Sequence, residues 1–133
     1  MEISVHDNHL LAYSVSSETR EIRLQTVYPA YEQAESEYTD VVFTDVVAYH
    51  FEGDRFSTIL FDVDEVKVED IYAENVERFE AGQRYCWPGV WNDGKQAVLD
   101  YLSAQSIKGY SLSSSIGMTG WVLAKDMRFE TRI

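Results

Sequence analysis

The first half of the chain alternates apolar and polar residues, the period of two that is typical of β-strands. The alternation covers 11–15 and 22–28 and is strongest at 41–51, where both faces carry apolar residues. A strand with two apolar faces is expected in the middle of a sheet, covered on both sides. The turn signal EGDR at 52–55 precedes another alternating segment at 56–66. We therefore expect 41–51 and 56–66 to pair as a hairpin.

The hydrophobic period lengthens after residue 67 to the spacing of an α-helix. Apolar residues recur at this spacing over 68–79, which predicts one helix that Gly82 ends. A second helix is expected to begin at Asp93, because Gln96 three residues later completes a capping-box pattern. This second helix is expected to end before Gly109.

The remaining segments complete an α+β pattern. Strand alternation returns at 107–114, 121–124 and 127–133, whereas 31–40 is polar and acidic and is expected to be an exposed loop. Strands that precede the helices without alternating with them favour an antiparallel sheet. We predict a single domain over 1–133, built from a mainly antiparallel β-sheet, curled or closed into a half-barrel, with two short helices on one side.

Charge narrows the range of partners. Acidic residues outnumber basic ones by 23 to 11, and the formal net charge is −12. The imbalance lies within residues 32–80, which hold 15 acidic and three basic side chains. A field of this sign repels phosphates and anionic lipid, so we expect neither nucleic-acid nor membrane-surface binding. It attracts cations and basic proteins instead.

The chain has the features expected of a cytoplasmic protein. Cys86 is its single cysteine, so an internal disulfide is excluded. The opening sequence MEISVHDNHLLAYS lacks the basic and apolar regions of a secretory signal. No apolar stretch has the length that a membrane-spanning helix needs.

Two segments match catalytic signatures only in part. The sequence GVWNDGKQ at 89–96 has the glycines and lysine of a phosphate-binding loop, but Gln96 occupies the position where that motif needs Ser or Thr. Cys86 has no histidine after it in the chain to generate a thiolate, as papain-like proteases require. We therefore expect no enzymatic activity and no cofactor.

Two other groups of side chains are candidates for ligand binding. The run from His6 through Asp7 to His9 carries two imidazoles and a carboxylate, which are donors for a divalent metal, although the same residue types also form turns. If the sheet curls, an aromatic-lined pocket is expected, with Tyr49, Tyr110 and Trp121 facing it.

A further aromatic group follows the first predicted helix. Tyr85, Trp87 and Trp91 lie within seven residues of one another. An exposed aromatic platform is one interpretation, but large aromatic side chains in a small domain are expected in the core first.

Three segments resemble those of a group of small bacterial proteins. They are HDNHLLAYS near the beginning, VVFTDVVAYHF with STILFDVDEV in the middle, and SLSSSIGMTGWVLAK near the end. Some of the similar chains are grouped with toxin-immunity proteins. The resemblance implies a toxin-neutralising role and assigns no functional residue.

The leading hypothesis is a non-enzymatic protein whose acidic segment 32–80 binds a basic protein, such as a toxin. The alternative is a domain that binds a small molecule or a metal through the aromatic pocket or the histidine cluster. The expected partner-binding residues are the exposed acidic side chains of the predicted loop and first helix: Glu32, Glu35, Glu37, Asp40, Glu69, Asp70, Glu74 and Glu77.

Overall fold

Six strands and three helices lie within the part of the chain that the structure, a computed structural model, describes: residues 4–30, 35–91 and 94–132. In chain order they are β1 (His9–Ser16), β2 (Glu21–Tyr28), β3 (Glu37–Glu52), β4 (Ile59–Val66), α1 (Val68–Glu74), α2 (Val76–Gln83), α3 (Lys95–Ala104), β5 (Lys108–Ile116) and β6 (Thr119–Arg132).

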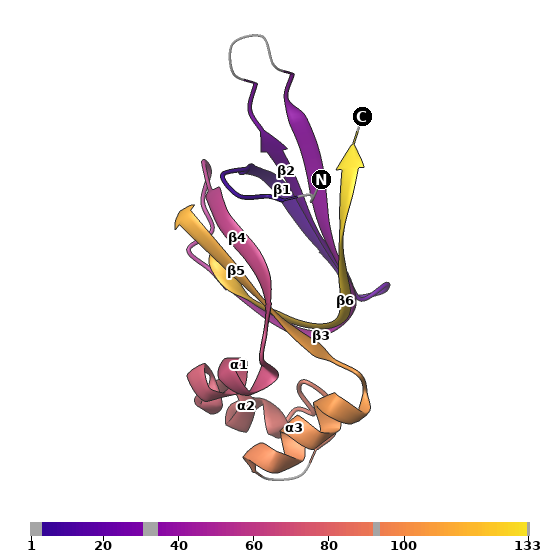
Figure 1. Cartoon of the computed structure of the whole chain (residues 1–133). Helices are drawn as coiled ribbons and strands as arrows, with labels where there is room; N and C mark the ends of the chain where they lie inside the picture. Colours follow the sequence, from indigo (N-terminus) through magenta and orange to yellow (C-terminus); the bar gives the residue numbers. More distant parts are fainter. Residues whose placement is uncertain (1–3, 31–34, 92–93, 133) are drawn as a thin grey trace.

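The strands form one curled antiparallel sheet in the order β1-β2-β3-β6-β5-β4. A bridge between His9 and Ile59 brings β1 next to β4, so the sheet closes into a ring. The helices gather at one end of this sheet (Figure 1). The prediction of an α+β fold with a mainly antiparallel, curled sheet is confirmed.

The predicted hairpin between 41–51 and 56–66 is wrong. β3 pairs with β2 and β6 on its two sides, whereas β4 pairs with β5 and touches β1. β3 has 16 residues, and β6 with 14 offers it a far longer partner than β4 with eight. β6 is also continuous where the sequence predicted two strands, because the exposed residues 125 and 126 only interrupt its apolar pattern.

The helical region contains three helices rather than the predicted two. The expected single helix over 68–79 is broken at Asn75, whose side-chain Nδ2 donates a hydrogen bond to the carbonyl of Ile71 at 2.8 Å. A side chain that bonds the backbone in this way competes with the regular helical pattern. Gly82 lies inside α2 rather than after it.

The third helix differs from the prediction at both ends. α3 begins at Lys95 with Gly94 as its N-cap, and the expected cap Asp93 lies outside the described residues. Gln96 donates to Asp100 at 2.7 Å, one turn further along the same helix. Gly109 belongs to β5 and does not end the helix, which stops at Ala104.

Two hydrophobic clusters lie on opposite faces of the sheet. Along β6, Val122 and Ala124 point into the ring, and Trp121 and Leu123 point toward the helices. This opposite placement follows from the alternation of side chains along a strand. β3 is likewise covered on both faces, since Val46 belongs to the ring cluster and Ala48 to the cluster beside the helices. No helix in the described part of the chain is both long and apolar enough to cross a membrane.

Candidate functional site

One predicted partner-binding residue, Asp40, is buried rather than exposed. Its side chain is 2% exposed, and its Oδ2 lies 2.8 Å from Nη1 of Arg23 on the neighbouring strand. Its other oxygen lies 2.7 Å from Nε of Arg132 on β6. The strand β3 already begins at Glu37, so the expected loop ends before Asp40. Asp40 therefore joins neighbouring strands of the sheet through ion pairs and is not available to a partner.

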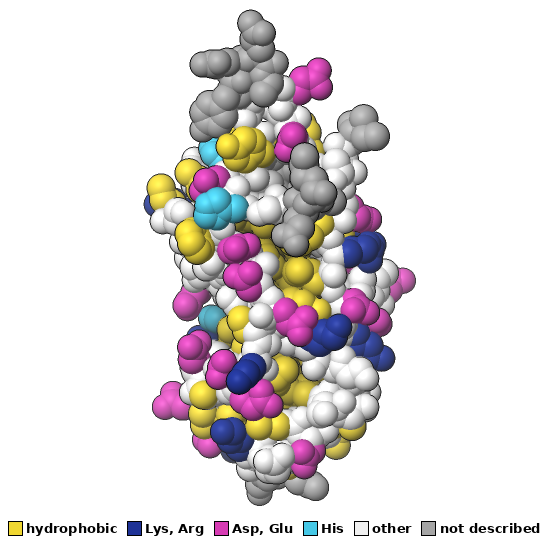
Figure 2. All heavy atoms as spheres, in the orientation of Figure 1, with side chains coloured by type: hydrophobic (Ala, Val, Ile, Leu, Met, Phe, Trp, Pro, Cys, Tyr) yellow, Lys and Arg dark blue, Asp and Glu magenta, His cyan; other side chains and the backbone are white. Residues whose placement is uncertain are grey.

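The other predicted acidic residues do not form one surface. Glu32 lies outside the described residues, Glu35 is exposed two residues before β3, and Glu37 is exposed at the first position of that strand. That part of β3 is far from the helices in Figure 1. Acidic side chains are also spread along the whole face that Figure 2 shows, among basic ones. The predicted continuous acidic surface is therefore divided.

The four other predicted carboxylates lie on the consecutive helices α1 and α2. Each is exposed, and within the described residues none forms an ion pair. Three of them lie in the first turn of a helix, where negative charge is favoured by the helix dipole. We call this set the acidic helix face: Glu69, Asp70, Glu74 and Glu77.

The histidine cluster forms a turn that connects the N-terminal segment to β4. His6 Nδ1 donates to the carbonyl of Phe61 at 2.7 Å, and its other ring nitrogen is 3.5 Å from Asp7. The backbone of Asp7 has a φ of 64°, which a turn requires. His9 lies further on, at the start of β1 beside Ile59. The described residues contain no group of three or more metal-ligating side chains.

Of the three predicted pocket residues, Tyr110 lies elsewhere. It is 4% exposed and packs edge-to-face against Phe43 inside the ring, with ring centroids 5.6 Å apart. Burial raises the pKa of its phenol to about 12, and the nearby carboxylates of Glu65 and Asp126 act in the same direction. Tyr110 belongs to the core.

Tyr49 and Trp121, by contrast, line one groove between the sheet and α2. Its volume is about 520 Å³, within the range of small-molecule sites. Its surface is mainly aromatic and apolar. We call it the aromatic groove, and its lining residues are Tyr49, His50, Arg78, Ala81, Gly82, Tyr85, Trp87 and Trp121.

Trp87 is held in the groove by the segment that follows α2. Its backbone N–H donates to the carbonyl of Gly82 at 2.9 Å, and its own carbonyl accepts from Nε1 of Trp91 at 3.0 Å. A Cβ on Gly82 would lie 2.4 Å from the Trp87 ring, so only glycine permits this approach. Trp87 then packs against Phe79 and Trp121, with centroids 5.2 and 6.2 Å away.

The indole of Trp121 carries a buried donor without an acceptor. Trp121 is 7% exposed, and its Nε1 has no hydrogen-bond partner. Leaving such a donor buried costs about 1–3 kcal/mol, and functional sites are one place where this cost is tolerated. Trp91 is buried to the same degree, but its Nε1 bonds the carbonyl of Trp87.

The remaining polar groups of the groove come from α2 and β3. Arg78 is exposed on α2 and forms no ion pair within the described residues. His50 pairs with the more exposed Glu52 at 3.4 Å, and its ring lies 6.3 Å from that of Trp121. Tyr85 is 77% exposed. The expectation that the aromatic group after α2 lies in the core is therefore wrong for Tyr85.

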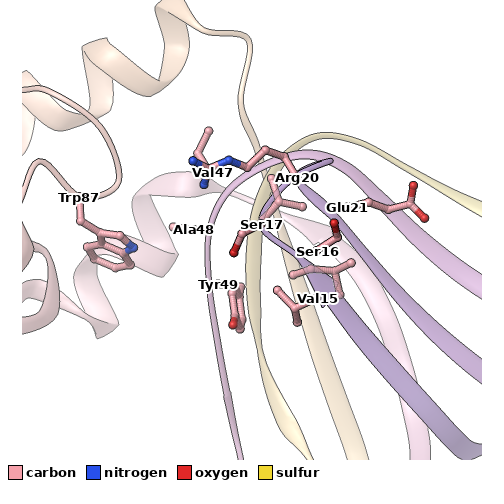
Figure 3. Close-up of a pocket in the computed structure, with 11 residues that line it drawn as sticks. Val15, Ser16, Ser17, Arg20, Glu21, Val47, Ala48, Tyr49 and Trp87 are labelled. Carbon is pink, nitrogen blue, oxygen red and sulfur yellow. The ribbon is translucent and has the colours of Figure 1, made fainter.

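A smaller cavity of about 160 Å³ adjoins the groove, since Tyr49 and Trp87 line both. Figure 3 shows Trp87 facing β3 from one side and the β1–β2 turn with Ser17 and Arg20 on the other. The turn is fixed to β3 because the carbonyl of Arg20 accepts from the N–H of Val46 at 2.9 Å. The two cavities therefore share Tyr49 and Trp87, with Arg20 lining the smaller one and Arg78 the groove.

Comparisons of the chain with protein-family models, with curated proteins and with solved structures found no match. Sequence reasoning did not include Arg78, Tyr85 and Trp87 in the pocket. The density of aromatic residues between 85 and 91 was the signal for two of them, whereas nothing in the local pattern distinguishes Arg78 from other helical arginines.

Proposed function

We propose that the protein is a non-enzymatic binding protein that holds a basic protein partner against its acidic helix face. The observation that carries this proposal is the exposure of Glu69, Asp70, Glu74 and Glu77 on two consecutive helices, where none of them forms an ion pair within the described residues. Unneutralised carboxylates on a rigid element attract a partner of opposite charge and increase its association rate. The resemblance to proteins grouped with toxin immunity suggests that this partner is a toxin.

The proposed setting is the cytoplasm. Cys86 is a free and exposed thiol, a state that reducing compartments maintain. The net charge of −12 opposes binding to nucleic acids and to anionic membranes. A basic protein is thus the macromolecular partner that the charge favours.

The test compares two sets of neutralising substitutions. The first replaces Glu69, Asp70, Glu74 and Glu77 with Gln or Asn, and the control set replaces Glu35 and Glu37 at the distant start of β3. Each chain is used to capture proteins from a lysate of the encoding organism, and captured proteins are identified by mass spectrometry. The association rate of any basic protein found is then measured at low and high salt.

We expect the wild type and the Glu35/Glu37 variant to bind the same basic protein. The four-residue variant is expected to bind it more slowly, and this difference should shrink at high salt because ions screen exposed charges. A partner that binds both variants equally, at either salt concentration, would contradict the proposal.

A second function, small-molecule binding, is favoured by the aromatic groove. Tyr49 and Trp121, which the sequence assigned to a pocket, lie there together with Trp87. Concave aromatic surfaces with a few polar groups are typical of ligand sites. A metal-dependent version of this function finds no support at His6, Asp7 and His9, which the structure uses in a turn and at a strand start.

A further inference from the structure

We infer that the aromatic groove binds a small aromatic carboxylate. This inference rests on the proposed small-molecule function and specifies its ligand. Arg78 and His50 bring N–H donors to the lining of the groove, Tyr49 and Tyr85 bring hydroxyls that donate or accept, and the unpaired indole N–H of Trp121 is buried. No Asp or Glu is among the groove's described lining residues, although the chain has 23 of them.

The lining of the groove is rich in aromatic rings. Tyr49 comes from β3 and Trp87 from the segment after α2. Trp121 forms part of the floor and is stacked on Phe79 beneath it at an interplanar angle of 17°. Aromatic side chains held in this way offer faces and edges to a planar ligand without first losing conformational freedom.

Arg78 determines the charge of the ligand. A guanidinium binds carboxylates through two parallel hydrogen bonds, and that of Arg78 has no described acidic partner. Aromatic cages also bind organic cations. In this groove, however, a cation would lie beside Arg78, and the nearby carboxylate of Glu52 pairs with His50 and is not among the lining residues.

The indole N–H of Trp121 supplies a second contact. It is a donor without an acceptor in a side chain that lines the groove. The nitrogen is out of contact with solvent, so an incoming acceptor reaches it only after a local rearrangement of the groove lining. The rings of Trp87 and His50 lie 6.2 and 6.3 Å from that of Trp121, and both residues line the groove.

The test uses three probes that share one ring system and differ in charge: 1-naphthoate, neutral 1-naphthalenemethanol and cationic 1-naphthylmethylammonium. Each is titrated into the ¹⁵N-labelled full chain, and the indole N–H signals of Trp87, Trp91 and Trp121 are followed by NMR. The signals are assigned on the wild-type chain, so no tryptophan variant is needed. Trp91 is the internal control, because its N–H is already bonded and it does not line the groove.

We expect 1-naphthoate to shift the Trp121 signal, to leave Trp91 unchanged and to bind at least tenfold more tightly than the alcohol. Arg78→Gln should weaken naphthoate binding at least fivefold and leave alcohol binding unchanged. The matched control Arg84→Gln removes the same charge from an exposed residue outside the groove and should change neither.

The outcomes test the class of ligand and the existence of the site as two separate claims. Equal binding of the acid and the alcohol, or tighter binding of the ammonium probe, would refute the carboxylate as the preferred ligand class. The groove would still be a small-molecule site. Failure of all three probes to shift Trp121 and Trp87 would overturn the groove as a ligand site and the inference with it.

Discussion

Asp40 and Arg23 form an ion pair on neighbouring strands, with 2.8 Å between the carboxylate and the guanidinium. Arg132 approaches the same carboxylate from β6, and the hydrogen bond to Asp40 is the largest cause of the raised pKa of Arg23. Neutralising Asp40 weakens its charge-assisted hydrogen bond to Arg23 and its ion pair with Arg132, two partly exposed arginines. Arg23 keeps Glu21 and Glu130 at 3.2 and 3.0 Å, so the loss is about 1.5–3 kcal/mol. We predict that Asp40→Asn lowers the free energy of unfolding by about this amount, measured by urea denaturation.

The control for this variant lies on the same strand. Glu37→Gln neutralises an exposed carboxylate and should change stability by no more than about 0.5 kcal/mol. If both variants lost the same free energy, the stabilising role of the buried pair would be refuted.

The different roles of these two acids show where the sequence pattern stops being informative. Glu37 and Asp40 belong to the same acidic stretch, and nothing in their immediate neighbours marks one of them as buried. The burial of Asp40 depends on Arg23 and Arg132, which are 17 and 92 positions away in the chain. Local alternation predicted that β2, β3 and β6 are strands, whereas their pairing depends on length and on contacts distant in sequence.

Burial of Tyr110 should lower the stability of the fold at alkaline pH. Its pKa in the fold is about 12, against an ordinary value of 10.0, so the fold favours the protonated phenol. Below pH 10 the phenol of Tyr110 is protonated in both states and contributes no pH dependence. Between pH 10 and 12 it ionises first in the unfolded chain, so the free energy of unfolding falls. We predict a loss that reaches about 2 kcal/mol at pH 12, measured by urea denaturation across this range.

The variant Tyr110→Phe isolates this contribution. It should lose less stability than the wild type between pH 9 and pH 11.5. Tyr13, whose pKa is also raised, chiefly by its hydrogen bond to Asp54, is retained in both chains and acts equally in both. Identical pH profiles for the two chains would contradict the assignment to Tyr110.

The two most buried tryptophans should respond differently to the same substitution. Trp91→Phe removes a donor that bonds the Trp87 carbonyl, whereas Trp121→Phe removes a donor that has no acceptor. Both changes delete the same atoms, so the losses from cavity formation are similar. We predict that Trp91→Phe is the more destabilising by about 1–2 kcal/mol, in thermal or urea unfolding. Equal losses would indicate that the N–H of Trp121 is paired in solution.

The groove shows the same limit of sequence reasoning as the sheet. Tyr49 and Trp121 were predicted for a pocket because they are aromatic residues on strands, and Tyr110 was included for the same reason. Which face each side chain occupies depends on register, and the pairing of β3 with β6 shifts between Val46 and Ala48. A shift of one residue moves a side chain to the opposite face. The bulge has no sequence signal. Tyr110 lies inside the ring because it pairs with Val122 of β6, which belongs to the same cluster.

Gly120 allows β6 to approach β3 beside the groove. A Cβ at this position would lie 2.0 Å from the carbonyl oxygen of His50, which belongs to the backbone of the paired strand. The clash cannot be relieved by a rotating side chain, so Gly120→Ala must separate the strands where His50 and Trp121 line the groove.

We therefore predict that Gly120→Ala destabilises the fold by about 2–3 kcal/mol, the upper range for overpacking. The adjacent substitution Thr119→Ala only shortens a half-buried side chain and should cost less than about 1 kcal/mol. In NMR spectra, Gly120→Ala should shift the indole signal of Trp121 more than that of Trp91, because the displaced backbone is next to Trp121. A stable Gly120→Ala chain with an unshifted Trp121 signal would show that the strands are further apart in solution than the structure places them.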